Sequence, residues 1–139
     1  MFRQRLTECA DHIQTHFNRI LSKLDQLPVI DAMAHATNGG KRLRGFLVLE
    51  SARLHGIDPK SAVWPAAGIE ALHAYSLVHD DLPCMDDDDL RRGQPTLHCA
   101  FDEATATRIN IKIMTRNLAR NLLGHDDFSY TMSLEIRRR

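Results

Sequence analysis

A dense run of carboxylates lies inside sequence that otherwise has the apolar spacing of buried helices. Residues 79–93 contain six aspartates, then two arginines, within fifteen positions. Like charges at this density repel one another unless a cation lies among them, and all-oxygen ligands suit a hard divalent ion such as Mg²⁺. A solvated acidic loop is the ordinary alternative. Spacing excludes a calcium EF-hand, because the sixth position counted from Asp86 must be glycine and is Arg91.

The apolar pattern predicts helices throughout, and no alternating strand pattern competes with it. Residues 2–24 repeat apolar side chains at three- and four-residue steps, and Pro28 ends that helix. Residues 37–40 end in two glycines and predict a break, because glycine tolerates positive φ and close backbone approach. The fold class expected is all-α. Helices are expected over 2–24, 30–35, about 42–56, 60–81 and from about 96, with Thr96 as N-cap and a loop over 86–95.

Pro83 decides whether the acidic run can form a metal site. On a straight helix the six-residue spacing of Asp80 and Asp86 turns their side chains about 240° apart. Pro83 must kink or end the helix, and that distortion can bring Asp86 back towards Asp80. His73 lies two helical turns before Asp80 on the same face, which favours contact with a phosphate. A satisfied core histidine is the alternative.

A basic segment, Gly-Gly-Lys-Arg-Leu-Arg over residues 39–44, precedes the third expected helix. Free N–H groups, the positive end of the helix dipole and the forks of Arg42 and Arg44 would together hold a diphosphate. The segment is not a Walker loop, because the Lys-Ser/Thr ending and a preceding strand are absent. A basic helix start exposed to solvent is the commoner explanation of such a motif on its own.

The length of the chain fits a single domain, and its overall charge points to no particular class of partner. The 139 residues have a formal net charge of +0, which argues against general nucleic-acid binding. Three scattered cysteines make no disulfide framework and no Cys-x-x-Cys pair, so a reducing, cytoplasmic location is expected. No apolar stretch of about 18 residues predicts a membrane span.

Together the motifs resemble the trans-polyprenyl diphosphate synthases, and most closely the bacterial farnesyl diphosphate synthase type. The resemblance rests on residues 39–44, 70–79 and 80–96, in family order, and covers about residues 1–106. It implies the N-terminal portion of the isoprenoid synthase helical bundle. It also implies condensation of isopentenyl diphosphate with dimethylallyl or geranyl diphosphate, through a Mg²⁺-assisted allylic carbocation, to a farnesyl-type diphosphate.

The resemblance also implies a role for particular side chains. Asp80, Asp81 and Asp86 would be the catalytic acids, with Asp80 and Asp86 as ligands of Mg²⁺. Tyr75 and Ser76 would set the length of the product, because a ring at Tyr75 forms the floor of the pocket and favours fifteen carbons. Isopentenyl diphosphate would be held by Lys41, Arg44, His73 and Arg92, and the allylic diphosphate by Arg91.

Two departures from the family pattern affect what the chain is expected to do. Gly45 stands where the family usually has proline, which should cost local rigidity and not chemistry. After Ala106 the pattern changes: residues 107–139 hold 7 basic and 3 acidic side chains, and a basic amphipathic helix is expected to about Gly124. The family's second Asp-rich motif is not found there. Residues 107–139 are therefore expected to be a divergent tail on a truncated chain.

Three functional hypotheses follow. The first is a prenyltransferase. The second is a truncated, non-catalytic chain that binds Mg²⁺ and diphosphate or a partner subunit, as a homodimer or through helix faces left exposed. The third is a basic amphipathic tail, over residues 108–139, that contacts a membrane surface or nucleic acid.

Overall fold

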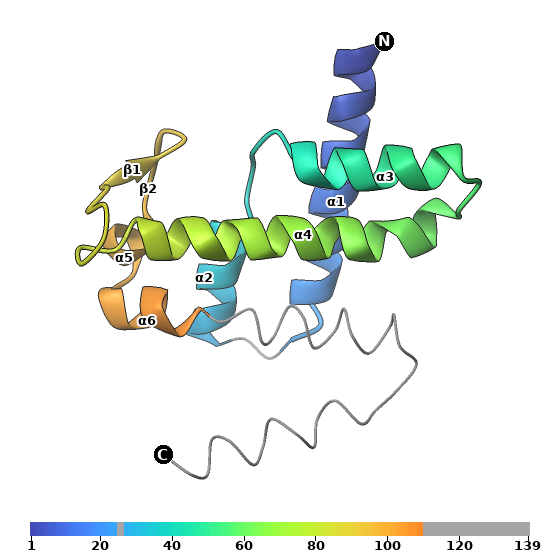
Figure 1. The fold of residues 1–139 in the computed structure, drawn as a ribbon. Helices are drawn as coiled ribbons and strands as arrows, with labels where there is room; N and C mark the ends of the chain where they lie inside the picture. The colour runs from blue at the N-terminus through green and yellow to red at the C-terminus, as the bar shows by residue number, and fades with distance from the viewer. Residues whose placement is uncertain (25–26, 110–139) are drawn as a thin grey trace, which may run out of the picture.

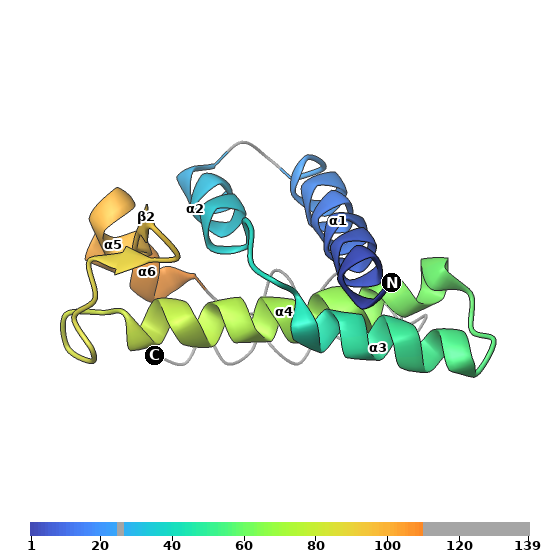
Figure 2. The ribbon, with the colours of Figure 1, turned by 90° about the horizontal axis from the view of Figure 1, so that it is seen from above.

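The computed structural model describes residues 1–24 and 27–109, and helices make up most of this part of the chain, as the all-α prediction requires. Figures 1 and 2 show the long helix α4 with α3 alongside it in one layer, while α1 and α2 cross on one side of that layer. The elements are α1 Phe2–Leu21, α2 Pro28–Ala36, α3 Leu43–Leu54, α4 Pro59–Asp80, β1 Leu90–Arg91, β2 Gln94–Pro95, α5 Leu97–Ala100 and α6 Glu103–Arg108.

Prolines and caps set the helix starts close to where the sequence predicts them. Pro28 begins α2 and Pro59 begins α4, where the missing N–H costs nothing. Asp58 caps α4, its carboxylate accepting a bond from the Lys60 N–H at 2.9 Å. The sequence predicted that Pro28 ends a helix, and here it opens the next one.

Two hydrophobic clusters hold the helices together. The first joins α1, α3 and α4, where small side chains on α4 let the other two helices approach closely. The second lies under the C-terminal end of α4 and fixes α2, α5 and α6 there. Its buried members are Leu21, Ala32, Met33, Val78, Leu82, Leu97, Ala106 and Ile109.

The structure corrects the expected loop over 86–95 and adds an element after it. Within this segment, β1 and β2 form an antiparallel ladder that pairs Leu90 with Pro95. Helix α6 starts at Asp102, whose carboxylate accepts a bond from the Thr105 N–H at 2.7 Å, and runs past Ala106 to Arg108. The helix expected up to about Gly124 lies outside the described residues. Across the described ranges, no helix combines the length and apolar character that crossing a membrane requires.

Candidate diphosphate site

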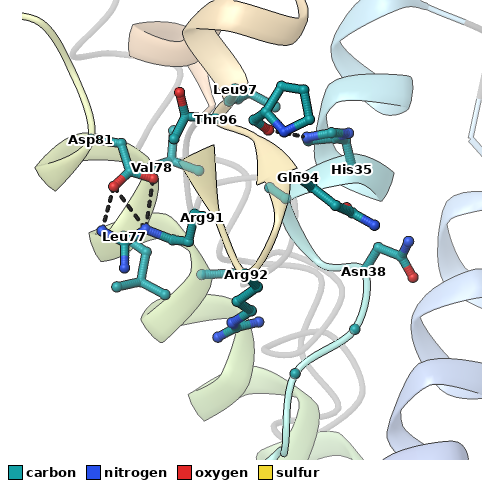
Figure 3. A pocket seen from close by; sticks show the side chains of 15 residues that line it. His35, Asn38, Leu77, Val78, Asp81, Arg91, Arg92, Gln94, Thr96 and Leu97 are labelled. Atoms are coloured by element: carbon teal, nitrogen blue, oxygen red, sulfur yellow. Dashed lines mark hydrogen bonds and ion pairs between the residues drawn. The ribbon is translucent and has the colours of Figure 1, made fainter. Parts of the chain in front are cut away.

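Three segments that are distant in sequence surround one open pocket of about 160 Å³. They are the Gly-Gly segment after α2, the C-terminal turns of α4, and the β1–β2 hairpin (Figure 3). The pocket thus joins the two motifs that the sequence singled out. Its charged and polar lining comes from Asn38, Asp81, Arg91, Arg92, Gln94 and Thr96.

The acidic run leaves the end of α4 by a tight turn. Helix α4 stops at Asp80, before Pro83, and the Asp86 N–H donates to the Asp80 carbonyl oxygen at 2.9 Å. The backbone therefore returns towards the helix end, as the spacing of the aspartates and Pro83 predicted. The Asp80 side chain is half-exposed and that of Asp86 is exposed, so solvent and ligands reach both.

Asp81 differs from its neighbours because it is buried and already paired. Its exposed fraction is 3 %. Arg91 Nε donates to both of its oxygens, at 2.7 and 2.8 Å, and Arg91 Nη2 donates to Oδ1 as well. This bond raises the pKa of Arg91 above its ordinary value. The pair ties β1 to the end of α4, and it leaves Asp80 and Asp86 as the accessible carboxylates of the three.

Arg92 occupies an unusual backbone position that brings it against the Gly-Gly segment. Arg92 and Gly93 form the turn between the strands, with φ of 54° and 77°, and positive φ at both central residues is what a type I′ hairpin turn needs. A Cβ added at Gly40 would lie 2.4 Å from Arg92 Nη1. The Arg92 guanidinium thus lies close to the Gly40 backbone, and the φ of 90° at Gly40 is a conformation that favours glycine.

Arg42 does not belong to the diphosphate site, so that part of the sequence interpretation is wrong. Its side chain is 4 % exposed and donates through Nη2 to Gln14 Oε1, at 2.7 Å, and to the Thr37 carbonyl oxygen. Nη1 lies 3.9 Å from Glu70 Oε2. Burial lowers the pKa of Arg42, with the Glu70 charge opposing that shift. Arg42 is a structural cation, whereas Lys41 and Arg44 beside it are exposed.

Glu70 is a buried acid of the scaffold that the sequence analysis did not single out. Besides Arg42, it accepts a bond from the Gly45 N–H at 2.8 Å, deep in the contact between α3 and α4. The sequence did contain a signal for this role, because Glu70 lies within an Ala-rich, apolar helix. A glutamate that is buried in such a helix needs a cation or an N–H group as a partner. Gly45, expected only to lose rigidity, supplies that N–H.

His73 lies among the cations of the site. Burial lowers its pKa, and the nearby charges of Arg44, Arg92 and Arg91 lower it further while Glu70 opposes them. His73 is therefore near enough to these arginines for their charges to act on it, and its contact with a phosphate stays a prediction. Tyr75, half a turn further on, packs its ring against the His79 ring with centroids 4.2 Å apart, and Ser76 is exposed.

Comparison with known proteins agrees with this geometry. The family model for polyprenyl synthetases matches residues 27–130, a span that runs past Ala106, where the motif resemblance stops. This chain belongs to the polyprenyl synthetase family.

Individual relatives point the same way. The farnesyl diphosphate synthase of Haemophilus influenzae is 48% identical over 107 residues, which cover 72% of this chain and 36% of that protein. The Escherichia coli farnesyl diphosphate synthase is 43% identical over 129 residues, covering 91% and 42%. Among solved structures, a geranyltransferase from Legionella pneumophila superposes with a TM-score of 0.76 at 37% identity, covering 86% of this chain and 42% of that one. The chain thus spans about two fifths of the length of these relatives.

Proposed function

We propose that this chain binds isopentenyl diphosphate and an allylic diphosphate and condenses them head to tail to a farnesyl-type diphosphate. One observation carries the proposal: Gly40 of the basic segment lies against Arg92 of the acidic segment, so two motifs 52 positions apart build one pocket. Arg91 and Arg92 line this pocket, and the accessible carboxylates Asp80 and Asp86 follow at the same end of α4. Cations beside accessible carboxylates suit a diphosphate held partly through a metal.

Isopentenyl diphosphate is assigned to the cationic wall. Lys41 and Arg44 are exposed at the start of α3, and Arg92 reaches the same region from the hairpin. His73, with its lowered pKa, stays neutral near pH 7 and offers a hydrogen bond without repelling these cations. The reactive double bond of the substrate then lies towards α4.

The allylic diphosphate is assigned to the acidic end of α4. Asp80 and Asp86 offer only oxygen donors that solvent reaches, which fits Mg²⁺ better than a softer metal. Mg²⁺ held there supplies positive charge to the departing diphosphate. Arg91 holds its hairpin through Asp81 with Nε and Nη2, and its Nη1 is the atom assigned to a phosphate oxygen.

Product length is assigned to Tyr75, with Ser76 beside it. The Tyr75 ring is half-buried and backed by His79, so it forms a firm floor five residues before Asp80. A growing prenyl chain that descends along α4 from the allylic site meets this ring early, which favours a product of fifteen carbons.

The test is a condensation assay on the 139-residue chain. Labelled isopentenyl diphosphate and geranyl diphosphate in Mg²⁺ are expected to give a labelled C15 diphosphate, and Asp80→Ala is expected to abolish it. Asp11→Ala, an exposed aspartate on α1, is the matched control and should keep the activity. Turnover that survives in Asp80→Ala would show that the acidic wall is not the reacting site.

A second function is favoured by apolar side chains exposed on α3 and α4. Leu47, Leu54 and Leu72 are 64%, 76% and 47% exposed. Large exposed apolar side chains on neighbouring helices are typical of a surface that another chain covers. In this alternative the chain binds Mg²⁺ and diphosphate without turnover and pairs with a second copy or a longer relative.

Sedimentation separates the two functions. A non-catalytic partner-binding chain predicts a dimer that Leu47→Glu converts to monomer, together with Mg²⁺-dependent bisphosphonate binding and no C15 product. If the chain is a monomer at all concentrations, the homodimer hypothesis is excluded. The free cysteines suit the reducing, cytoplasmic location proposed for either function.

A further inference from the structure

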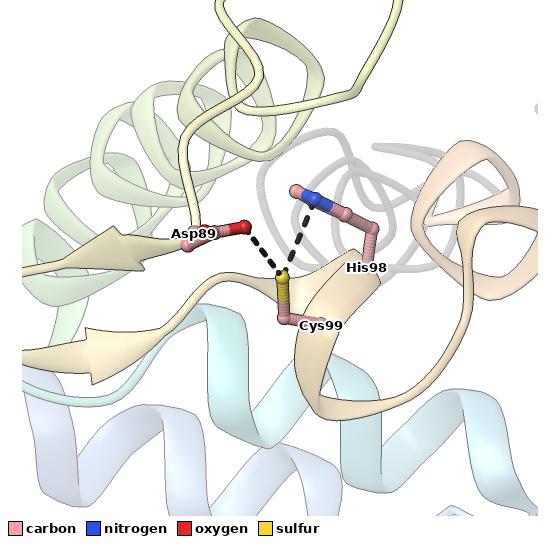
Figure 4. Close-up of side chains that lie close together, drawn as sticks. All are labelled: Asp89, His98 and Cys99. Carbon is pink, nitrogen blue, oxygen red and sulfur yellow. Dashed lines mark hydrogen bonds between the residues drawn. The ribbon is translucent and has the colours of Figure 1, made fainter.

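Three side chains of different metal-ligand type meet outside the diphosphate pocket. Asp89 directly precedes β1, while His98 and Cys99 lie in the short helix α5 that follows β2. The hairpin folds these segments together, and the Thr96 N–H donates to the Asp89 carbonyl oxygen at 2.9 Å. One ligand atom from each of the three side chains lies within 4.8 Å of the other two (Figure 4).

The separations around the sulfur already match those of a tetrahedral metal site. Cys99 Sγ lies 3.5 Å from Asp89 Oδ1 and 3.4 Å from His98 Nε2. With Zn–S about 2.3 Å and Zn–N or Zn–O about 2.1 Å, neighbouring ligands of a tetrahedral zinc lie about 3.4–3.6 Å apart. Small side-chain rotations therefore suffice to place an ion between the three atoms.

The imidazole of His98 is held in the form that a metal needs. The Thr96 hydroxyl has one hydrogen and donates it to the Asp88 carbonyl oxygen at 2.7 Å. Towards His98 Nδ1, at 3.3 Å, the hydroxyl oxygen then acts as acceptor. Nδ1 therefore carries the proton and the lone pair of Nε2 faces Cys99, which is the arrangement of a metal-bound histidine with its supporting partner.

We propose that Asp89, His98 and Cys99 bind a zinc ion, with the fourth position open to solvent. A thiolate and an imidazole in the ligand set select zinc over magnesium, which prefers oxygen alone. On binding, Cys99 loses its thiol proton to solvent and forms the sulfur–zinc bond. Asp89 and Cys99 are exposed and His98 is half-buried, so the ion reaches all three from solvent.

Such an ion would fasten the start of β1 to α5. This closes the base of the hairpin that carries Arg91 and Arg92. None of the three ligands lines the diphosphate pocket, and the zinc site can be present or absent whatever the outcome of the condensation assay. The alternative to a zinc site is that the Cys99 thiol only makes ordinary hydrogen bonds to its two neighbours.

Cobalt substitution decides between these two descriptions. Titration of the full chain with Co²⁺ is expected to produce a thiolate-to-cobalt charge-transfer absorption in the near ultraviolet, and Zn²⁺ should bleach it. Cys99→Ser is expected to remove this absorption. Cys84→Ser is the matched control, because Cys84 is also an exposed free thiol but lies outside the cluster, and it should leave the absorption intact.

Two further variants test the other ligands. His98→Gln and Asp89→Asn are each expected to weaken Zn²⁺ at least about tenfold in competition with a chelating dye. Helical circular dichroism, measured on every variant, checks that the fold is retained. No charge-transfer absorption in the unmodified chain, or one that persists in Cys99→Ser, would overturn the proposal.

Discussion

His16 is a buried histidine whose protonation opposes folding. It is 3 % exposed, and its ring meets the Trp64 ring edge to face with centroids 4.4 Å apart. Its Nδ1 lies 3.1 Å from Arg19 Nη2, and because arginine only donates, Nδ1 accepts and Nε2 carries the hydrogen. That Nε2 has no hydrogen-bond partner within the described residues. The site therefore accommodates only the neutral ring.

Because of His16, the free energy of unfolding is expected to fall at acid pH. Burial, with Arg19 adding, lowers the pKa of His16 from 6.5 to about 4. The unfolded chain binds the proton more tightly, so stability is complete above pH 6.5 and falls as the pH drops towards 4, by about 3 kcal/mol in total. Urea unfolding at several pH values should show this loss. His16→Phe should flatten it, and His55→Gln, an exposed histidine at the C-terminal end of α3, should not.

Arg92 shows a conflict between backbone preference and charge. Its φ of 54° is a conformation that costs a non-glycine residue about 1 kcal/mol. Arg92→Gly is therefore expected to raise the free energy of unfolding by about 1 kcal/mol, and to lower the affinity of the cationic wall for bisphosphonate, measured without Mg²⁺, about tenfold, since a charged hydrogen bond is lost. Arg3→Gln, which removes an exposed cation from α1, should change neither quantity. Equal affinity in Arg92→Gly would exclude Arg92 from the site.

Between elements, the ion pair of Asp81 and Arg91 is the main polar link of the hairpin to α4. Asp81 is 4 % exposed at its side chain and Arg91 is 32 % exposed. Arg91→Met leaves a buried carboxylate without its cation and is expected to cost about 3 kcal/mol of unfolding free energy. Arg53→Met breaks the exposed pair with Glu50 on α3 and should cost less than about 1 kcal/mol. Similar costs for the two variants would contradict the assigned role.

The crossing of α1, α3 and α4 depends on the absence of a side chain at Gly45. A Cβ there would lie 2.4 Å from Ile13 Cδ1 and 3.2 Å from the Ala66 carbonyl oxygen. Gly45→Ala is expected to destabilise by about 1 kcal/mol, because overpacking outweighs the gain in helix propensity. In an Ile13→Val background the same change should become neutral or stabilising. Additive effects in this double-mutant cycle, measured by urea unfolding, would refute the close contact.

The elements that sequence predicted well are those marked by local signals. Proline at Pro59 and the glycines at 39–40 fixed where helices start and break, and Pro83 predicted the turn after Asp80. The β1–β2 ladder was missed because its strands have two residues each and its turn places an arginine, Arg92, where asparagine or glycine is usual.

Arg42 shows a different limit of sequence reasoning. Nothing beside it in the sequence distinguishes it from Arg44, since its partners Gln14 and Glu70 lie 28 positions away on either side. Burial of a cation depends on tertiary contacts that only the folded chain brings together. The anion site at this segment stays a prediction, and the structure decides which cations are available to it.

At the scale of the whole molecule, the described part of the chain is a helical frame with its charges concentrated at one end of α4. The first hydrophobic cluster holds α1 and α3 against α4, and the second places α2, α5 and α6 around its C-terminal end. The overall net charge is +0, yet Arg91 and Arg92 line one pocket at the C-terminal end of α4, where Asp80 and Asp86 follow. The central claim is that this pocket binds a diphosphate through Mg²⁺.

Calorimetric titration of the 139-residue chain with methylene bisphosphonate, with and without Mg²⁺, tests that claim most directly. A Mg²⁺-dependent binding event is expected at the acidic end of α4, beside any metal-free binding at the cationic wall, and Asp80→Asn and Asp86→Asn are each expected to weaken the Mg²⁺-dependent event at least about tenfold. Asp11→Asn, on the exposed face of α1, should bind like the unmodified chain. No Mg²⁺-dependent binding in the unmodified chain, or Mg²⁺-dependent binding that is unchanged in both acidic-run variants, would contradict the account.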